Sequence, residues 1–345
     1  MASAGRVVLV TGVSRDLGRR FARAAAAHPN VDRVIGVDVV PPGGDIGGMS
    51  FVRADIRNPV IAKVIAKEDV DTVVHLSIIS TPLVGGGRSM MKELNVIGTM
   101  QLLAACQKSA TVKSLVVKST AHVYGASSRD PAMFTETSET RRAGGGYAKD
   151  VAEIEGYVRG FARRRPDVCV TTLRCANVIG PKVTSPMTSY LRLPLIPRRL
   201  GYDPRLQFLH EHDLYGALGH VLRSEVAGTF NLAGDGVMPL SQVVRRLQRP
   251  MLPVPSFGLG LLKSAHVAQV SPELRALLTF GRGIDTTRTR EVLGFEPTYS
   301  TAAALDDFAQ DLVPTGGRVD RALATLEAQL PSVRAQHALQ ESLDG

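Results

Sequence analysis

RVVLVTGVSRDLGRRFARAAAAHPNVDRVIGVDVVPP, Arg6–Pro42, is the stretch that determines the fold class. Its continuous apolar run, Val7–Val10, is typical of a strand buried on both faces of a parallel sheet. The run breaks at Gly12, a helical stretch follows from about residue 17 to 27, and a second apolar run ends at Asp38. This order predicts a βαβ unit whose glycine turn places a pyrophosphate at a helix N-terminus.

The turn departs from the pattern T-G-x-x-G-x-x-G at one position. Gly12 and Gly18 are in place, but Arg15 stands where the middle glycine lets backbone approach a pyrophosphate. Its side chain either folds outward to pair with a phosphate or fills the cofactor groove. Asp38, twenty residues after Gly18, is placed to accept hydrogen bonds from the ribose of NAD and to repel the extra phosphate of NADP.

Composition sets the broad class. The 345 residues are 44% hydrophobic and 21% charged, which suits a soluble globular protein. No apolar run approaches the ~20 residues of a membrane-spanning helix, and the N-terminus runs into a strand with no room for a signal peptide, so we expect a cytoplasmic protein. The three cysteines have no metal-binding spacing, so no metal site is expected.

The net charge of +9 suggests an anionic partner. Nucleic acid, an anionic membrane surface and a phosphorylated small molecule are the partners such a charge allows. Aromatic residues make up only 5% of the chain and do not alternate with the arginine clusters, so no stacking platform for single-stranded nucleic acid is evident. Arg198 and Arg205, in the proline-rich basic region, are candidates to reach a nucleotide diphosphate. The alternative is that they lie in a solvated loop.

Strands and helices alternate through the first half, which predicts an α/β fold built on a doubly wound parallel sheet. The helices are expected at residues 61–67 and 90–107, and further strands at 71–76, 114–118 and 167–177. Residues 206–213 and 228–232 look like strands that return to the sheet. The predicted organisation is a dinucleotide-binding domain at 1–180, an interlocked substrate region at 181–314 and an amphipathic helical tail at 315–345.

The chain resembles the extended short-chain dehydrogenase/reductase family, the NAD-dependent epimerase/dehydratase group, which has a Rossmann fold. The resemblance spans roughly residues 6–299 and rests on ordered motifs: VLVTGVSRDLG, VIGVD, FVRADIRNP, DTVVHLS, ELNVIGTMQLL, KSTAHVYG, AKDVAEIEGYV, LRCANVIGP, LQFLHEHDLYGAL, GTFNLAGDG and DTTRTREVLGFEP. Within the family it is similar to an actinobacterial branch of UDP-glucose 4-epimerase-like proteins.

The resemblance implies roles for individual residues. The cofactor-binding residues begin with those of the glycine turn, which are Gly12, Arg15, Asp16, Leu17 and Gly18, and with Asp38, which would bind the adenosine ribose. Asp55 and Ile56 would flank the adenine, Leu76 and Ser77 would lie along the cofactor, and Asn95 would lie in the helix that supports it. Asn177 is implied at the mouth of the site. Thr120 takes the place of the catalytic serine or threonine, its alternative role being to cap backbone at a strand end.

The chemistry of this family needs a Tyr and a Lys four residues apart on one helix face, so that the cation lowers the pKa of the phenol. Lys149 aligns with the lysine and is also implied to hold the nicotinamide ribose, but Gly145 stands four residues before it. Tyr147 is on roughly the opposite face if the segment is already helical. Three interpretations stay open: Tyr147 reaches the site from a non-helical turn, another residue such as Tyr124 serves, or the protein binds NAD without catalysis.

We therefore expect an NAD-dependent enzyme that transiently oxidises a nucleotide sugar, with Thr120, Tyr147 and Lys149 as catalytic candidates. The alternatives are a catalytically degenerate NAD-binding sensor or scaffold and, less favoured, a dehydrogenase of a steroid or lipid alcohol, suggested by the apolar loop Leu191–Leu195. The family often forms dimers through two helices per subunit, which here are expected to begin near Met90 and Tyr147.

Overall fold

The computed structural model describes residues 5–81, 87–139, 146–255 and 271–312. Its centre is a seven-stranded sheet in the order β11-β6-β5-β4-β1-β2-β3, in which every neighbouring pair is parallel. The strands are β1 Arg6–Thr11, β2 Val31–Asp38, β3 Met49–Arg53, β4 Thr72–His75, β5 Ser114–Thr120, β6 Cys169–Cys175 and β11 Gly228–Leu232. The predicted doubly wound parallel sheet is confirmed.

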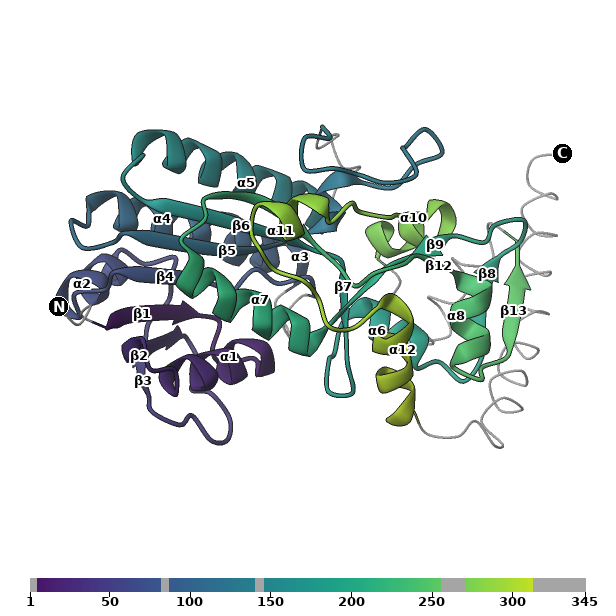
Figure 1. Ribbon diagram of the computed structural model, residues 1–345, viewed down its shortest axis with the longest axis horizontal. Coiled ribbons are helices and arrows are strands. Elements are labelled where there is room, and N and C mark those ends of the chain that lie inside the picture. The colour runs from purple at the N-terminus through teal and green to yellow at the C-terminus, as the bar shows by residue number, and fades with distance from the viewer. Residues whose placement is uncertain (1–4, 82–86, 140–145, 256–270, 313–345) are drawn as a thin grey trace, which may run out of the picture.

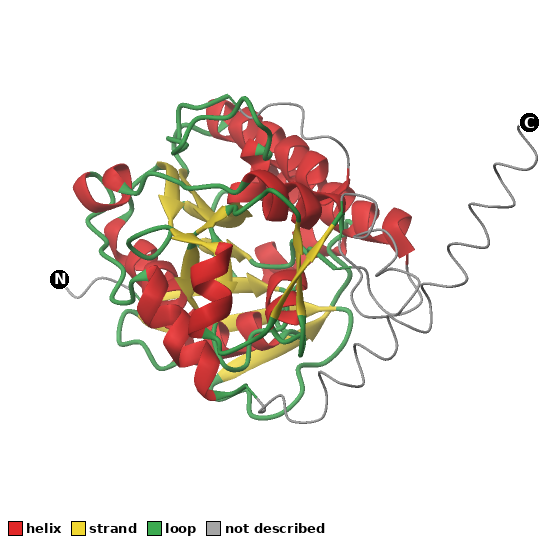
Figure 2. Ribbon diagram, turned by 90° about the vertical axis from the view of Figure 1, so that its right-hand side faces the viewer, coloured by secondary structure: helices red, strands yellow, loops and turns green. Residues whose placement is uncertain are grey.

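Helices cover both faces of this sheet, with α4 and α5 on one side and α1 and α7 on the other (Figure 1). Figure 2 shows the strands between these helices. The helices of this part are α1 Asp16–Ala26, α2 Val60–Lys67, α3 Gly87–Lys92, α4 Gly98–Lys108, α5 Gly146–Arg164, α7 Glu211–Ser224 and α11 Thr287–Glu291. The helix expected at 90–107 is interrupted by a π-helical turn, η1 Glu93–Ile97, and a 3₁₀ turn, η2 Ala121–Tyr124, follows β5.

A smaller region lies beyond the carboxyl ends of the strands (Figure 1). It contains three two-stranded pairings: β7 Asn177–Ile179 with β10 Phe208–His210, β8 Ile196–Arg199 with β13 Met251–Val254, and β9 Arg205–Leu206 with β12 Met238–Pro239. Its helices are α6 Pro186–Leu191, α8 Leu240–Arg246, α10 Pro272–Phe280 and α12 Thr301–Gln310. It has a hydrophobic cluster of its own, which includes Tyr190, Phe208 and Phe308.

One of the two segments expected to return to the large sheet does so. Residues 228–232 form β11, the edge strand beside β6. The expectation for residues 206–213 is wrong in part, because β10 pairs with β7 in a separate small sheet and the chain then enters α7. The helical tail expected at 315–345 lies outside the described residues, and the domain boundaries stay a prediction.

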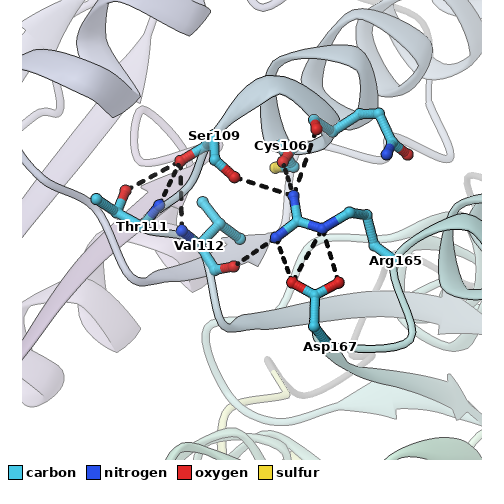
Figure 3. A network of polar contacts seen from close by, with 7 residues as sticks. Cys106, Ser109, Thr111, Val112, Arg165 and Asp167 are labelled. Carbon is cyan, nitrogen blue, oxygen red and sulfur yellow. Dashed lines mark hydrogen bonds and ion pairs between the residues drawn. The ribbon is translucent and has the colours of Figure 1, made fainter.

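Arg165, just after α5, fastens the end of α4 to the sheet (Figure 3). Its guanidinium donates to the main-chain oxygens of Cys106 (2.9 Å), Ser109 (2.9 Å) and Val112 (3.3 Å) and pairs with Asp167 at 2.6 Å. The last carbonyls of a helix have no partner within the helix, so this arginine satisfies groups that would otherwise need water. The connections at the amino end of β5 and β6 are thereby held together.

No helix in the described part of the chain is long and apolar enough to cross a membrane. The cytoplasmic location stays a prediction.

Candidate functional site

The glycine turn after β1 has no room for side chains at two positions. Gly12 has φ +83°, and a Cβ there would lie 2.9 Å from the main chain of Ser77. A Cβ on Gly18 would lie 2.2 Å from the carbonyl oxygen of Gly12. These contacts explain why both positions must be glycine, and they let the start of α1 sit directly over the ends of β1 and β4. The sheet order reverses between these two strands, which is where open α/β sheets bind ligands.

Asp38 ends β2 and fastens the turn. Its carboxylate accepts hydrogen bonds from the Ser14 backbone N–H (3.0 Å), the Ser14 hydroxyl (2.6 Å) and the Val39 N–H (2.8 Å). A carboxylate offers about four acceptor positions, so one remains for a ligand hydroxyl. The side chain thus positions the turn and can still receive a ribose.

Arg15, at the place of the middle glycine, lies in a cavity above the turn rather than turned away from it. Burial lowers the pKa of the Arg15 guanidinium, while the charges of Asp38 and Tyr147 raise it. Arg15 thus lines the groove without closing it, because a cavity of about 420 Å³ remains beside it. In that position the cation faces both the acid at the end of β2 and the start of α5.

The cavity has a volume of about 420 Å³ and extends from the glycine turn to the smaller region. Its lining joins the predicted turn residues with predicted catalytic and substrate residues: Gly12, Arg15, Asp16, Leu17 and Gly18; Leu76; Thr120 and Tyr147; Asn177. The same cavity is lined by charged or polar side chains that the sequence analysis did not single out: Lys118, His122, Lys182, Ser185 and Glu273. Their signal in the sequence was weak, except that His122 and Lys118 flank Thr120 in KSTAHVYG.

Of the residues expected around the adenine and along the cofactor, Leu76 lines this cavity, and the others hold local structure outside it. Asp55 pairs with Arg57 at 2.6 Å, and the hydrogen bond from Arg57 lowers the pKa of the Asp55 carboxyl. Ile56 is buried, and Ser77 lies against Gly12. Asn95 is buried and makes two hydrogen bonds to the backbone of Ile79. Its Oδ1 accepts from the Ile79 N–H at 2.8 Å, and its Nδ2 donates to the Ile79 carbonyl at 2.9 Å. Asn95 acts on the cavity wall through Ile79.

The structure brings Thr120 and Tyr147 to the same cavity and leaves Lys149 outside it. Helix α5 begins at Gly146 (φ +67°), so Tyr147 is in its first turn, buried, while Lys149 is exposed. Two residues along an α-helix turn the side chain by about 200°, so the two cannot share a face. The structure thus gives Lys149 no contact with the cavity, and the residue four after Tyr147 is Val151, which is fully buried.

The surroundings of Tyr147 disfavour its phenolate. Burial raises the pKa of Tyr147, and the charges of Cys175, Glu273 and Asp150 raise it further, whereas Arg15 lowers it. Glu273 comes from α10, and a Cβ on Gly146 would lie 1.9 Å from its Oε1. The carboxylate of a distant helix therefore packs directly against the residue where α5 begins.

Thr120 and His122 form a second polar pair at the end of β5. The Thr120 hydroxyl lies 2.9 Å from His122 Nδ1 and accepts the His122 backbone N–H at 3.3 Å. The His122 ring approaches the Tyr147 ring edge-on, with 6.0 Å between centroids. Thr120 therefore does cap the backbone of η2, as its alternative role required, and also presents its hydroxyl to the cavity.

The two arginines predicted to reach a diphosphate are placed elsewhere. Arg205 is exposed, and Arg198 lies 3.9 Å from Asp203; neither lines the cavity. The cations that do face it are Arg15, Lys118 and Lys182. Arg15 was among the predicted cofactor residues. Lys118 and Lys182 were not, because the cavity is assembled from segments far apart in the chain.

The residues present fit the predicted cofactor, NAD. The close packing at Gly12 and Gly18 holds the start of α1 over the ends of β1 and β4, where a pyrophosphate binds in such folds, and Asp38 keeps a free acceptor for a ribose hydroxyl. The cavity continues from this turn to Thr120 and Tyr147, where a reacting group would be expected.

Comparison with known proteins gives the family. The model of the NAD dependent epimerase/dehydratase family matches residues 8–233. An uncharacterized protein of Mycobacterium tuberculosis is 49% identical over 312 residues, which are 88% of this chain and 83% of that protein.

Solved structures share the fold at low identity. The dTDP-glucose 4,6-dehydratase of Bacillus anthracis, in complex with NAD, has a TM-score of 0.67 at 20% identity and covers 89% of this chain and 96% of its own. The UDP-glucuronic acid 4-epimerase of Bacillus cereus, in complex with NAD, has a TM-score of 0.67 at 17% identity and covers 88% of this chain and 98% of its own. The predicted Rossmann fold, the predicted cofactor NAD and the resemblance to the extended short-chain group are confirmed. The chain belongs to the NAD dependent epimerase/dehydratase family.

Proposed function

We propose that this protein is an NAD-dependent epimerase/dehydratase-type enzyme that transiently oxidises a hydroxyl of a nucleotide sugar. The observation that carries the proposal is the continuity of one cavity from the glycine turn to Thr120 and Tyr147. A cofactor held at the turn and a substrate held by the smaller region would meet at these two side chains. When bound, NAD would supply the hydride acceptor.

The charges of the cavity support an anionic substrate. Lys118, Lys182 and Arg15 line it, and positively charged side chains attract a diphosphate in a partly desolvated site. The solved structures of similar fold include enzymes named for UDP- and dTDP-linked sugars. A nucleotide sugar is thus the substrate class that best agrees with both the lining and the neighbours.

Within this mechanism Thr120 orients the substrate hydroxyl, because its own hydroxyl is fixed by His122 and faces the cavity. Tyr147 stands beside it as a hydrogen-bond donor, since burial keeps its phenol protonated. Asn177, at the start of β7, lines the mouth and is available to a sugar hydroxyl. The apolar wall, which includes Leu76 and Ile78, excludes water from the reacting carbon.

The second candidate is a catalytically degenerate NAD-binding sensor or scaffold. It is favoured by a specific observation: Lys149, which aligns with the family's lysine, is outside the cavity, and Gly145 stands where the family has its tyrosine. The steroid or lipid alternative has no such support. Leu191 and Leu195, which suggested it, are buried and do not line the cavity.

We further propose a homodimer through α3, α4 and α5. Met90, Ile97 and Met100 are large apolar side chains that remain about two-fifths exposed along α3, η1 and α4. Helix α5 packs against both α3 and α4, so these helices form one continuous surface. Burying that surface against a second copy removes apolar area from water.

Turnover decides between the enzyme and the scaffold. The full chain is incubated with NAD and either UDP-glucose or UDP-glucuronic acid, and the sugar is followed by proton NMR. The proposal predicts a new sugar signal from at least one probe, reduced by about 100-fold or more in Thr120→Val. The matched control is Lys149→Ala, which should leave the rate unchanged. Tight NAD binding with no change in either sugar would favour the scaffold.

A further inference from the structure

The pair formed by Thr120 and His122 has a geometry suited to moving a proton. The Thr120 Oγ1 lies 2.9 Å from His122 Nδ1, and both side chains line the cavity. The Thr120 oxygen accepts the His122 backbone N–H, and a threonine hydroxyl has one proton to donate. If that proton points to Nδ1, the remaining lone pair of Oγ1 faces the cavity, where it can accept the proton of a substrate alcohol.

The lysine to which the resemblance assigns the activation of a tyrosine, Lys149, is outside the described cavity. Val151, fully buried, holds the position four residues after Tyr147, and Lys149 is exposed on another face of α5. Glu273 packs against the start of α5 and adds negative charge near the phenol. Tyr147 is therefore better placed to donate a hydrogen bond than to remove a proton.

Charged groups from several elements face His122. Burial lowers the pKa of His122 to about 3, and the cations Arg282, which follows α10, and Lys118, on β5, lower it further. Tyr147, on α5, presents its ring edge, and Glu273, on α10, lines the same cavity. In the free protein the imidazole is accordingly neutral at neutral pH and can accept a proton.

Arg282 is a buried cation through which a bound substrate could change the pKa of His122. Its side chain is buried and its Nε has no hydrogen-bond partner among the described residues. Arg282 and His122 both line a small cavity that shares Asn177 with the large one. An anionic substrate among these cations would offset their repulsion of an imidazolium, so binding would raise the pKa of His122 and make it a stronger base.

We propose that His122 is a positioning residue that receives, through Thr120, the proton of the substrate alcohol. The inference rests on the proposed function. The substrate O–H bond breaks and its proton joins Thr120 Oγ1, while the Thr120 proton joins His122 Nδ1. NAD, when bound, would be the oxidant and would accept the electron pair of the adjacent C–H bond as hydride. When the ketone is reduced again, the protons return along the same path.

The first test needs neither substrate nor turnover. Full-length protein with ¹⁵N-labelled histidine is examined by NMR at neutral pH, and His122 is assigned by the signals lost in His122→Gln. We expect a neutral imidazole with the proton on Nε2 and with Nδ1 as an acceptor, and a shift of the Nδ1 signal in Thr120→Val. A proton on Nδ1, or no change in Thr120→Val, would overturn the relay.

The second test separates a relay from a structural role. His122→Ala should lower kcat by about 100-fold and leave the NAD affinity measured by calorimetry unchanged. Added imidazole should restore part of kcat, with a rate that rises as free imidazole loses its proton. His212→Ala, an exposed histidine on α7, is the matched control. An unchanged kcat, or a loss that imidazole does not restore, would contradict the relay.

The two tests also separate the inference from the proposed function. If the wild type turns over neither UDP-glucose nor UDP-glucuronic acid, the proposed function fails, and the NMR result alone decides whether Thr120 donates to His122.

Discussion

Replacing Glu155 with alanine removes the carboxylate at the centre of a buried network between α5 and strands β5 and β6. The side chains of Arg174 and Glu155 are only 5% and 3% exposed, and they meet at 2.7 and 3.1 Å. The Ser119 hydroxyl donates to the same carboxylate at 2.6 Å. The other end of the Arg174 guanidinium donates to the Tyr124 hydroxyl at 2.8 Å.

The magnitude follows from what the substitution leaves behind. Without Glu155, the Arg174 guanidinium stays buried with a phenol and a carbonyl as its partners, and the Ser119 hydroxyl loses its acceptor. Removing one member of a buried ion pair costs about 3–5 kcal/mol, much more than the pair itself contributes. We expect a loss of about 4 kcal/mol in Glu155→Ala and a smaller loss in Glu155→Gln, which keeps an acceptor and the shape.

Urea unfolding followed by circular dichroism measures this loss. The midpoint should fall while the slope with denaturant stays unchanged, because the same surface is exposed on unfolding. Glu153→Ala is the matched control on the same helix: its carboxylate accepts only the half-buried Tyr157 hydroxyl among the bonds described, and its loss should cost about 1 kcal/mol or less. A loss of less than about 1 kcal/mol in Glu155→Ala would refute the argument for a buried, charged network.

Three further outcomes are expected. Arg165→Ala should lower the free energy of unfolding by about 1–2 kcal/mol in urea titrations, since the α4 carbonyls lose their donor, whereas the exposed Arg163→Ala should not. Burial lowers the folded-state pKa of His75 to about 4, so its stabilising contribution is complete above pH 6.5 and is lost as the pH falls through 4. Thermal unfolding measured from pH 7 to 4 should show the free energy of unfolding fall by up to about 3 kcal/mol, and by less in His75→Gln. Equal pH dependence of stability in the two proteins would contradict this account of His75. Ile97→Asp should convert the proposed dimer to a monomer by light scattering, and a wild-type monomer would refute the dimer.

The sequence predicted those parts of the fold that depend on local patterns. The glycine turn, the apolar runs and Asp38 lie within one βαβ unit, so their spacing was enough to predict the sheet and the turn. The pairing of β10 with β7 was not predictable in this way, because it depends on a partner strand some thirty residues away that is equally short.

The start of α5 shows the same limit within the site. Three consecutive glycines, Gly144–Gly146, allow several starting points for the helix, and the sequence favoured the alignment through Lys149. The observed start at Gly146 is accompanied by a left-handed φ and by the carboxylate of Glu273, which comes from α10. The electrostatic surroundings of Arg15 likewise include Asp38 and Tyr147, which come from other elements of the chain.

The measurement that tests the account most directly is a calorimetric titration of the full chain with NAD and with NADP. The account predicts that NAD binds and that NADP binds more weakly, because the Asp38 carboxylate keeps one acceptor for a ribose hydroxyl and repels a phosphate there. Asp38→Asn should reduce the difference in affinity between NAD and NADP. Binding of neither dinucleotide, or equal binding of both to the wild type, would contradict the assignment of this cavity to NAD.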